Sequence, residues 1–257
     1  MRINTNVGAL NASKNAALNG MSTETSMRKL SSGLRISRAA DDAAGLSIAN
    51  KLRTQSRSLT VASANAEQGN AMLQIAEGAA QTIQKILERQ KELIIQREST
   101  GNNSSVTGTL NAEISTLSTE VERIVSSTNF QGASVFTSLS FQVSDGTAGG
   151  SVTVAASLAA SSVTLASTAG ISAVDTALDS INSVLANIGA GQNRLDYTVQ
   201  NLKAAVVNVK AAESTIRDVD MAEEMANYTK NNILTQAAQA MLSQANQSSQ
   251  SVLSLLR

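Results

Sequence analysis

The sequence predicts a mainly α-helical protein, in which long antiparallel coiled-coil helices form a rod and a small β-hairpin region interrupts them. Two observations carry this prediction. First, two long stretches place apolar residues alternately three and four positions apart, which is the spacing of a coiled-coil interface. Second, the 257 residues include no proline, no tryptophan, two tyrosines and three phenylalanines. The absence of proline therefore permits very long helices, and the apolar content is mainly aliphatic, which suits helix packing.

The apolar repeats define the two longest predicted helices. The first repeat comprises Leu52, Gln55, Leu59, Ala62, Ala66, Gly69, Leu73, Ala76, Ala80, Ile83, Leu87, Gln90 and Ile94. The second comprises Val174, Leu178, Ile181, Leu185, Ile188, Gln192, Leu195, Val199, Leu202, Val206, Val209, Glu213 and Ile216. A strict heptad over this length implies a left-handed supercoil, and about 43 residues give a helix of roughly 65 Å. Such helices are expected to pack against other helices rather than to enclose a catalytic pocket.

The N-terminal half is predicted to contain three helices. Residues 1–40 form a helix with a break at Ser31–Gly33, because glycine interrupts helices. Residues 45–100 form the first long helix, which the run of polar residues and glycine at 99–103 ends. Residues 104–128 form the next helix, and the short connection makes these two helices antiparallel neighbours.

Residues 130–168 change character and are rich in Ser, Thr, Gly and β-branched residues. Val135–Val143 and Ser151–Ala155 are predicted to form a hairpin around Asp145-Gly146, with a third strand at Ser162–Ala166. A long helix then covers 174–216, and a final helix covers roughly 220–256. This last helix has its own repeat of Leu234, Ala238, Met241, Ala245, Ser248, Val252 and Leu255.

Composition argues against several classes of function. The chain has no His and no Cys, so it lacks the commonest general base and the thiolate ligands of metal sites, and we expect no enzyme and no cofactor. The formal net charge is zero with no basic block, which argues against nucleic acid. No secretory signal is visible, and no apolar window reaches the roughly 18 residues of a membrane span. The residues alone would place the protein in the cytoplasm.

The two ends of the chain carry complementary charges. Residues 1–40 contain six basic residues and Glu24, whereas residues 218–257 contain four acidic and two basic residues. The ends could therefore pair with each other or with copies of themselves. Neither end is a convincing free helix, because helices owe most of their stability to packing, so we expect both to be ordered by partners. We interpret the acidic group at 218–224 as a helix start rather than a cation site, and Asp41-Asp42 as part of a linker rather than a catalytic pair.

Several strings closely resemble the bacterial flagellin family. At the N-terminal side these are Ile3–Asn6, Lys29–Ile36, Asp41–Gly45 with Ile48-Ala49, and Thr128–Gly132. At the C-terminal side they are Gln192–Leu195, Leu242–Gln247 and Val252–Arg257. The resemblance covers both ends in order, and this chain departs from longer members by having only about 40 residues between the two halves. It is therefore expected to be a short form that lacks the variable outer domains.

The resemblance implies a function and a domain plan. Flagellins polymerise into the helical filament of the bacterial flagellum, so residues 1–44 and 216–257 would form an inner-tube domain and residues 45–215 a rod-shaped core. The polymerisation residues would be Ile3, Val7, Leu10, Leu30, Leu34, Leu234, Met241, Val252 and Leu255. The implied partners are further copies, the flagellar type III export apparatus, a secretion chaperone on the C-terminal helix, and the filament cap and hook-junction proteins. Export through that apparatus would make the protein extracellular without a cleavable signal.

The resemblance also implies recognition by the vertebrate Toll-like receptor that senses flagellin. The segment Glu88–Gln96 is similar to the flagellin segment bound by this receptor, and the residues implied are Arg89, Leu93, Gln96 and, on the next helix, Glu113. Three positions in that segment depart from the commonest pattern: Gln90, Lys91 and Ile94. A surface that only contacts other subunits is the alternative for the same helical face.

Two other functions compete with the filament subunit. A flagellin-like junction protein between hook and filament would share the helical ends. A cytoplasmic signalling coiled coil would form stable dimers, but it would leave the hairpin segment unexplained.

Overall fold

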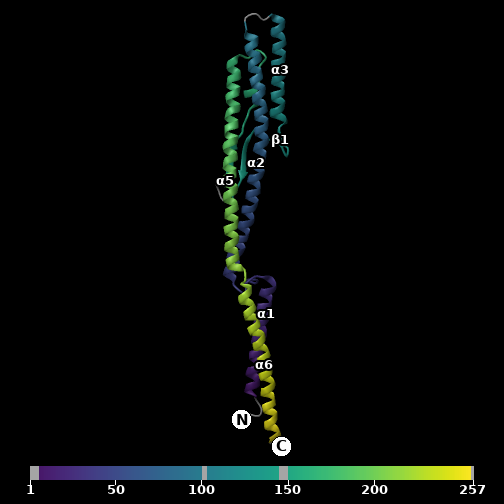
Figure 1. The fold of residues 1–257 in the computed structure, drawn as a ribbon, viewed down its shortest axis with the longest axis vertical. Helices are drawn as coiled ribbons and strands as arrows, with labels where there is room; N and C mark the ends of the chain where they lie inside the picture. Colours follow the sequence, from purple (N-terminus) through teal and green to yellow (C-terminus); the bar gives the residue numbers. More distant parts are fainter. Residues whose placement is uncertain (1–5, 100–102, 145–149, 256–257) are drawn as a thin grey trace. The chain divides into compact units, whose positions relative to one another are not determined.

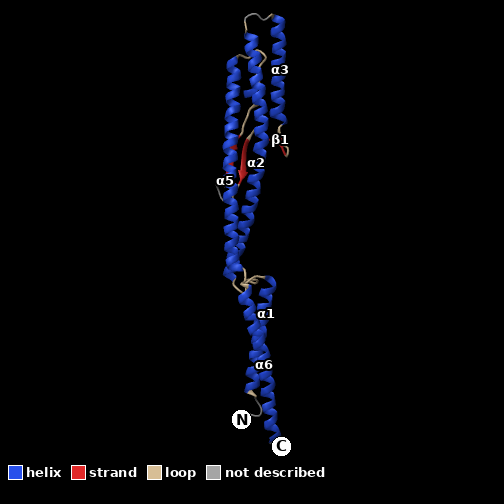
Figure 2. Cartoon of the chain, in the orientation of Figure 1, coloured by secondary structure: helices blue, strands red, loops and turns tan. Residues whose placement is uncertain are grey.

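The computed structural model describes residues 6–99, 103–144 and 150–255, with side chains as far as Ser248. In this part the chain forms two compact units, one of residues 1–54 with 209–257 and one of residues 55–208. We refer to them as the terminal unit and the core unit. Figures 1 and 2 show that helices make up most of both units. The predicted functional division at residues 45 and 216 is not tested by these units and stays a prediction.

Three long helices build most of the described part of the core unit. They are the parts of α2 (Ala43–Glu98) and α5 (Ile171–Arg217) that lie within residues 55–208, and the whole of α3 (Ser104–Ser127). Polar contacts along the edge of the α2–α5 interface run in opposite directions on the two helices, joining Lys91 to Asp175 at 2.6 Å and Lys203 to Glu67 at 2.8 Å. The two helices are therefore antiparallel, as the repeats predicted.

The buried face of α2 follows its predicted repeat. Within the core unit, every repeat position except the exposed Gln55 is buried, namely 59, 62, 66, 69, 73, 76, 80, 83, 87, 90 and 94. Five of these eleven residues are Ala or Gly, and Ala66, Ala76 and Ala80 have no exposed surface. Small residues let neighbouring helices approach closely, so the low aromatic content of the chain is matched by the geometry of its core.

The buried face of α5 is broader than its predicted repeat. Val174, Ile181, Ile188, Leu195 and Leu202 are buried as expected. The alternate positions 178, 185 and 199 are only partly buried, whereas Ala177, Val184 and Gly191 are buried instead. The reason is a second neighbour beside α2: a Cβ placed on Gly191 would lie 2.6 Å from Val154 of the hairpin and 3.3 Å from Leu73 of α2.

Two short antiparallel hairpins lie between α3 and α5 in the sequence. The predicted hairpin is confirmed as β3 (Ser138–Gln142) paired with β4 (Ser151–Ala155), in register Leu139 with Val154. Its alternating pattern buries Leu139, Val152 and Val154 against the helices. A smaller hairpin precedes it, with β1 (Asn129–Phe130) paired to β2 (Ala133–Ser134). Figure 1 shows the β3–β4 hairpin lying along α2 and α5.

The predicted third strand is wrong. Residues 162–166 instead include the end of a short helix, α4 (Ala160–Val163). Local hydrogen bonds favour this turn, because the hydroxyls of Ser162 and Thr164 donate to the carbonyls of Ala159 and Ala160 at 2.7 Å. Such side-chain bonds compete with a β ladder. Val163 and Leu165 are nevertheless buried, so the apolar residues of this segment enter the core without forming a strand.

The terminal unit contains α1 (Val7–Ser32) and α6 (Met221–Leu255), which pack against each other. They run antiparallel, since Asn6 at the start of α1 donates to the carbonyl of Ala245 at 2.9 Å and Lys29 near its end lies 3.7 Å from Glu224. The predicted break at 31–33 is confirmed, because α1 ends at Gly33 in the left-handed conformation with φ 70°. Of the two pairings that the end charges allowed, the structure shows the one within the chain.

Candidate assembly surface

The terminal unit is organised around the end of α1. The N–H of Gly33 donates to the carbonyl of Lys29 at 2.8 Å, which closes the last turn of the helix. The chain then pairs briefly with the segment before α6, where Leu34 forms an antiparallel bridge with Asp218 and Val219 N–H donates to Gly33 at 3.1 Å. This pairing fixes how the chain enters α6 after α5.

Arg35 donates hydrogen bonds to the last backbone carbonyls of α5. Its guanidinium donates to the carbonyls of Thr215 at 3.0 Å and Ile216 at 2.7 Å, and its backbone N–H donates to Arg217 at 2.7 Å. The last carbonyls of a helix have no partner within the helix and favour positive charge. One residue thus joins the turn after α1 to the end of α5 within the terminal unit, a role that no sequence pattern indicated.

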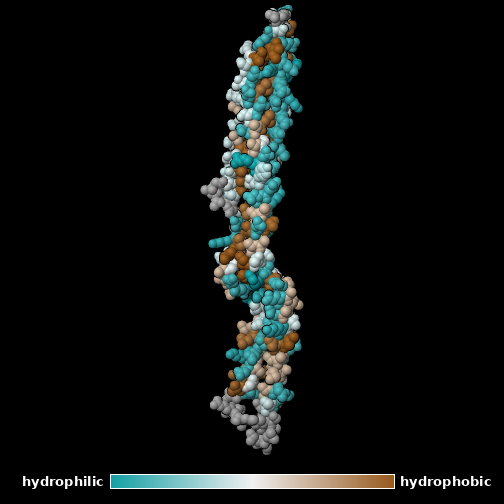
Figure 3. Space-filling view, turned by 60° about the vertical axis from the view of Figure 1, so that its left-hand side comes forward, coloured by the Kyte–Doolittle hydropathy of each residue, from teal (hydrophilic) through white to brown (hydrophobic). Residues whose placement is uncertain are grey.

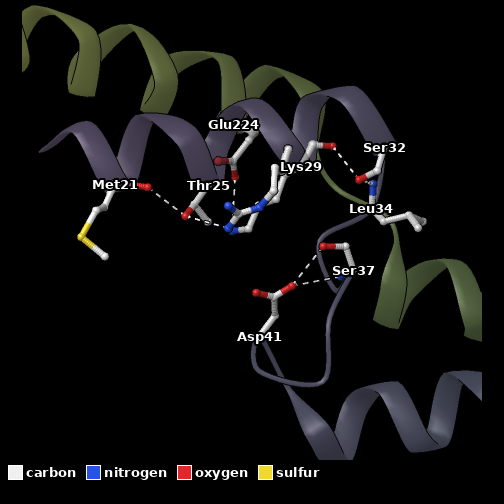
Figure 4. A network of polar contacts seen from close by, with 9 residues as sticks. Met21, Thr25, Lys29, Ser32, Leu34, Ser37, Asp41 and Glu224 are labelled. Carbon is white, nitrogen blue, oxygen red and sulfur yellow. Dashed lines mark hydrogen bonds and ion pairs between the residues drawn. The ribbon is translucent and has the colours of Figure 1, made fainter. Parts of the chain in front are cut away.

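The two aspartates of the linker accept hydrogen bonds that hold local turns. Asp41 accepts hydrogen bonds from the backbone of Arg38 at 2.9 Å and from the backbone and hydroxyl of Ser37 at 3.1 and 3.2 Å (Figure 4). These bonds, the backbone bond of Arg38 first, lower the pKa of Asp41 below its usual value. Asp42 accepts from Gly45 N–H at 2.9 Å at the start of α2, so each carboxylate has a structural task.

The acidic group before α6 is a helix start. Asp220 accepts hydrogen bonds from the N–H groups of Ala222 at 2.9 Å and Glu223 at 3.3 Å. Glu223 and Glu224 follow in the first turn, where negative charge favours the helix dipole. Glu224 is largely buried and faces Lys29 of α1 (Figure 4). Among the residues that the structure describes, no group of three or more acidic side chains is arranged to hold a metal ion.

The α1–α6 pair has almost no apolar core of its own. Across the described side chains of both helices, the buried residues are Ser26, Glu224 and Ala238. Large apolar side chains instead lie on the surface with 41% to 69% exposure, namely Val7, Leu10, Leu18, Met21, Met27, Met221, Met225, Ile233, Leu234 and Met241. Figure 3 shows such residues in brown on the surface of this unit. Exposed apolar patches on this scale mark interaction surfaces.

The predicted polymerisation residues fall mainly on this surface. Val7, Leu10, Leu234 and Met241 are exposed, and Leu30 and Leu34 are half-buried near the end of α1. Ile3 lies outside the described residues. Val252 and Leu255 lie within the helical backbone of α6, but their side chains are outside the described part. A shallow apolar hollow lined by Met225, Ile233 and Leu234 lies on α6 in the same region.

The residues of the predicted receptor site lie in the core unit, on α2 and α3. Arg89 is about half-exposed and donates to Glu113 of α3 at 3.3 Å and to Glu92 at 2.9 Å. These two carboxylates, Glu92 first, raise the pKa of the Arg89 guanidinium. Gln96 is exposed, but Leu93 is buried with 1% exposure. The structure therefore brings Arg89 and Glu113 together and places Leu93 in the core beneath them rather than on the same open face.

Gln90 and Ser118 form a buried polar cluster that the sequence analysis did not predict. Gln90, a position of the α2 repeat, has no exposed surface, and its amide donates to Ser118 at 3.0 Å and to the carbonyl of Ile114 at 3.2 Å. Ser118 in turn donates to the carbonyl of Leu165 at 2.8 Å. The cluster ties α2, α3 and the segment after α4 together. A glutamine among mostly apolar repeat positions was its signal.

Comparison with known proteins covers both halves of the chain. The profile of the bacterial flagellin N-terminal helical region matches residues 3–140, and that of the bacterial flagellin C-terminal helical region matches residues 171–256. The chain is 40% identical to the flagellin of Bacillus subtilis strain 168 and 42% identical to that of Halalkalibacterium halodurans, in both cases over the full length of each protein. It is 38% identical, again over both full lengths, to the flagellar filament 33 kDa core protein of Treponema phagedenis.

Proposed function

This chain belongs to the bacterial flagellin family, and from that premise we propose that it polymerises through the exposed apolar surface of α1 and α6 into the filament of a flagellum. The observation that carries the proposal is the scarcity of buried apolar residues in that helix pair beside the many exposed ones. Burying a Leu-sized side chain contributes about 1.5–3 kcal/mol. If neighbouring copies cover the half-exposed side chains of both helices together, their burial would therefore contribute a large favourable free energy of assembly that the monomer lacks.

The surface favours open-ended growth over a closed pair. Its apolar residues lie along both helices, from Val7 and Leu10 near one end to Met27 and Met221 near the other. A contact between two different patches of identical subunits is repeated from each subunit to the next. If the rotation between neighbouring subunits does not close a ring, the result is an open helical filament. The family is structural, and a filament subunit needs no catalytic group.

The comparisons do not favour the alternative functions. Relatives that match over their full length are named as flagellins or flagellar filament core proteins, which speaks against a hook-junction protein and against a signalling coiled coil. No helix in the described part of the chain is long and apolar enough to cross a membrane. The flagellar filament is extracellular, so the residue-based expectation of a cytoplasmic protein is set aside. The export apparatus, a chaperone on α6, and the cap and hook-junction proteins stay expected partners.

The assembly proposal is tested by sedimentation of purified protein before and after adding filament seeds. We expect monomer to become pelletable polymer, and we expect Leu234→Asp to reduce the pelletable fraction by at least about ten-fold. Gln239→Asp is the matched control, because it adds the same charge to an exposed polar position of the same helix. Removing Val252–Arg257 should also abolish assembly. A closed dimer at every concentration, or equal loss in both Asp variants, would refute the proposal.

Recognition by the Toll-like receptor that senses flagellin is a second proposal. Its support is the Arg89–Glu113 pair, which two neighbouring helices hold at the surface, and arginine often anchors interfaces. Arg89→Ala should lower receptor-dependent signalling by monomer about ten-fold, which is about 1.4 kcal/mol. Arg123→Ala is a control, because it removes an exposed arginine paired within α3 alone. Because Leu93 is buried, Leu93→Ala should act through stability, and intact signalling by folded Arg89→Ala would exclude this site.

A further inference from the structure

The methionines of this chain are divided sharply between its two units. Of the seven in the sequence, six lie in the described part, and five of these are on α1 or α6. All five are about half-exposed or more: Met21 67%, Met27 56%, Met221 48%, Met225 49% and Met241 63%. The sixth, Met72, lies in the core unit and is 8% exposed. The sulfur that solvent can reach is therefore concentrated on the candidate assembly surface.

The geometry of individual side chains supports this contrast. In Figure 4 the sulfur of Met21 points away from α6 and from the polar contacts around Lys29. Met221 and Met225 are one helical turn apart at the start of α6, so they share a face. Met225 also lines the apolar hollow with Ile233 and Leu234. Met72, in contrast, belongs to the apolar core that α2 forms with α5 and the hairpin.

We propose that the thioethers of Met21, Met27, Met221, Met225 and Met241 are a redox-sensitive modification site, at which oxidation of the free subunit blocks polymerisation. The inference rests on the proposed assembly function. The oxidant is a peroxide: hydrogen peroxide transfers one oxygen atom to the sulfur, the sulfide becomes a sulfoxide, and the peroxide is reduced to water. The chain has no cysteine, so no thiol competes for the oxidant.

Oxidation would act on assembly rather than on the core. A sulfoxide is polar and chiral, and it disrupts interfaces built on methionine. An interface that covers these side chains must then enclose an S=O group, which needs a hydrogen-bond donor that an apolar neighbouring surface does not supply. The core unit keeps its packing, because Met72 is shielded. The expected product is a folded subunit that cannot polymerise, and in a filament the same sulfurs become covered.

The test treats purified monomer with hydrogen peroxide, removes the oxidant, and divides the sample between peptide mass spectrometry and seeded sedimentation. We expect the five surface methionines to gain oxygen before Met72, and the pelletable fraction to fall at least about ten-fold. Preformed filaments should resist the same treatment. Methionine sulfoxide reductases of both stereospecificities should restore polymerisation of the oxidised monomer.

The matched control is a variant in which all five methionines are replaced by leucine, since Met and Leu differ little in volume. The fivefold variant should polymerise equally well with and without peroxide. If it assembles poorly, variants confined to Met21 with Met27, or to the three methionines of α6, replace it, and peroxide should reduce their polymerisation less than that of the wild type. Normal polymerisation of oxidised wild-type protein would overturn the proposal. Peroxide sensitivity of the fivefold variant, or sensitivity of both partial variants equal to that of the wild type, would also overturn it. Untreated wild-type protein that never polymerises would instead overturn the assembly function and the inference with it.

Discussion

Two glycines of α5 offer a paired test of how the core unit is packed. Gly189 and Gly191 are two residues apart on the same helix, and replacing a helical glycine by alanine adds about 1 kcal/mol of helix propensity in each case. A Cβ at Gly189 would meet no heavy atom within 4 Å, whereas at Gly191 it would lie 2.6 and 2.8 Å from the two methyl groups of Val154. The propensity gain is common to both variants, so their difference isolates the steric contact.

The contact at Gly191 cannot be relieved cheaply. Val154 is 2% exposed, it is paired with Leu139 across the hairpin, and its branched side chain has few alternative rotamers. Overpacking a full core costs roughly 1–3 kcal/mol. We therefore expect Gly189→Ala to stabilise the protein by about 0.5–1 kcal/mol, and Gly191→Ala to be less stable than Gly189→Ala by roughly 1–3 kcal/mol.

The assay is reversible urea or thermal unfolding of the monomer, followed by circular dichroism. For a chain of this size the difference corresponds to a gap of several degrees in Tm between the two variants. If Gly191→Ala proved as stable as Gly189→Ala, the hairpin would not press on α5 as described. The broader buried face of α5 would then need another cause.

Two further predictions concern a buried apolar position and a carboxylate of the linker. Leu202 is 6% exposed, so Leu202→Asp places a carboxylate without a partner in the core and should lower the free energy of unfolding by roughly 3–5 kcal/mol. Asn201→Asp, at the exposed neighbouring position, is its control. Equal urea midpoints for the two variants would show that the buried face of α5 is misassigned. The lowered pKa of Asp41 means that its charged form is favoured in the folded state, so its contribution is present above the unfolded pKa of about 3.9 and is lost as the pH falls through the lower folded value. Asp41→Asn should therefore be less stable than the wild type near neutral pH, and the two proteins should converge in stability in acid. A difference between their urea midpoints of unfolding that stays constant with pH would contradict this.

How far the sequence could predict the fold depended on how many neighbours each helix has. On α2 the three-four spacing identified most of the buried positions of the core unit, because this spacing reflects which side chains face an adjacent helix, but it missed Met72 and Leu93. On α5 the same rule predicted Leu185 but missed Val184 and Gly191, because the hairpin covers a second face. A one-dimensional repeat carries no information about a neighbour that arrives from elsewhere in the chain.

The short segments were harder to predict for a different physical reason. Alternation of apolar and polar residues identified β3 and β4, where pairing over five residues reinforces the pattern. The stretch around Ser162 and Thr164 has similar composition, but its hydroxyls bond to nearby carbonyls and favour a helical turn. Arg35 likewise gave no sign in the sequence, since its partners, the carbonyls of Thr215 and Ile216, become acceptors only where α5 ends.

The apolar repeat of α6 is where prediction and structure differ most usefully. The rule that correctly buried Leu73 and Ile83 on α2 also predicted an interface through Leu234 and Met241, yet the chain leaves both of these exposed. Propensity does not explain the difference, because both segments are helical throughout their described parts. What differs is the set of neighbouring elements: the core unit provides α3, α5 and the hairpin, whereas the described part of α6 packs mainly against α1. We propose that other copies cover the repeat that its own chain leaves exposed, and this is why the α1–α6 surface is the candidate assembly surface.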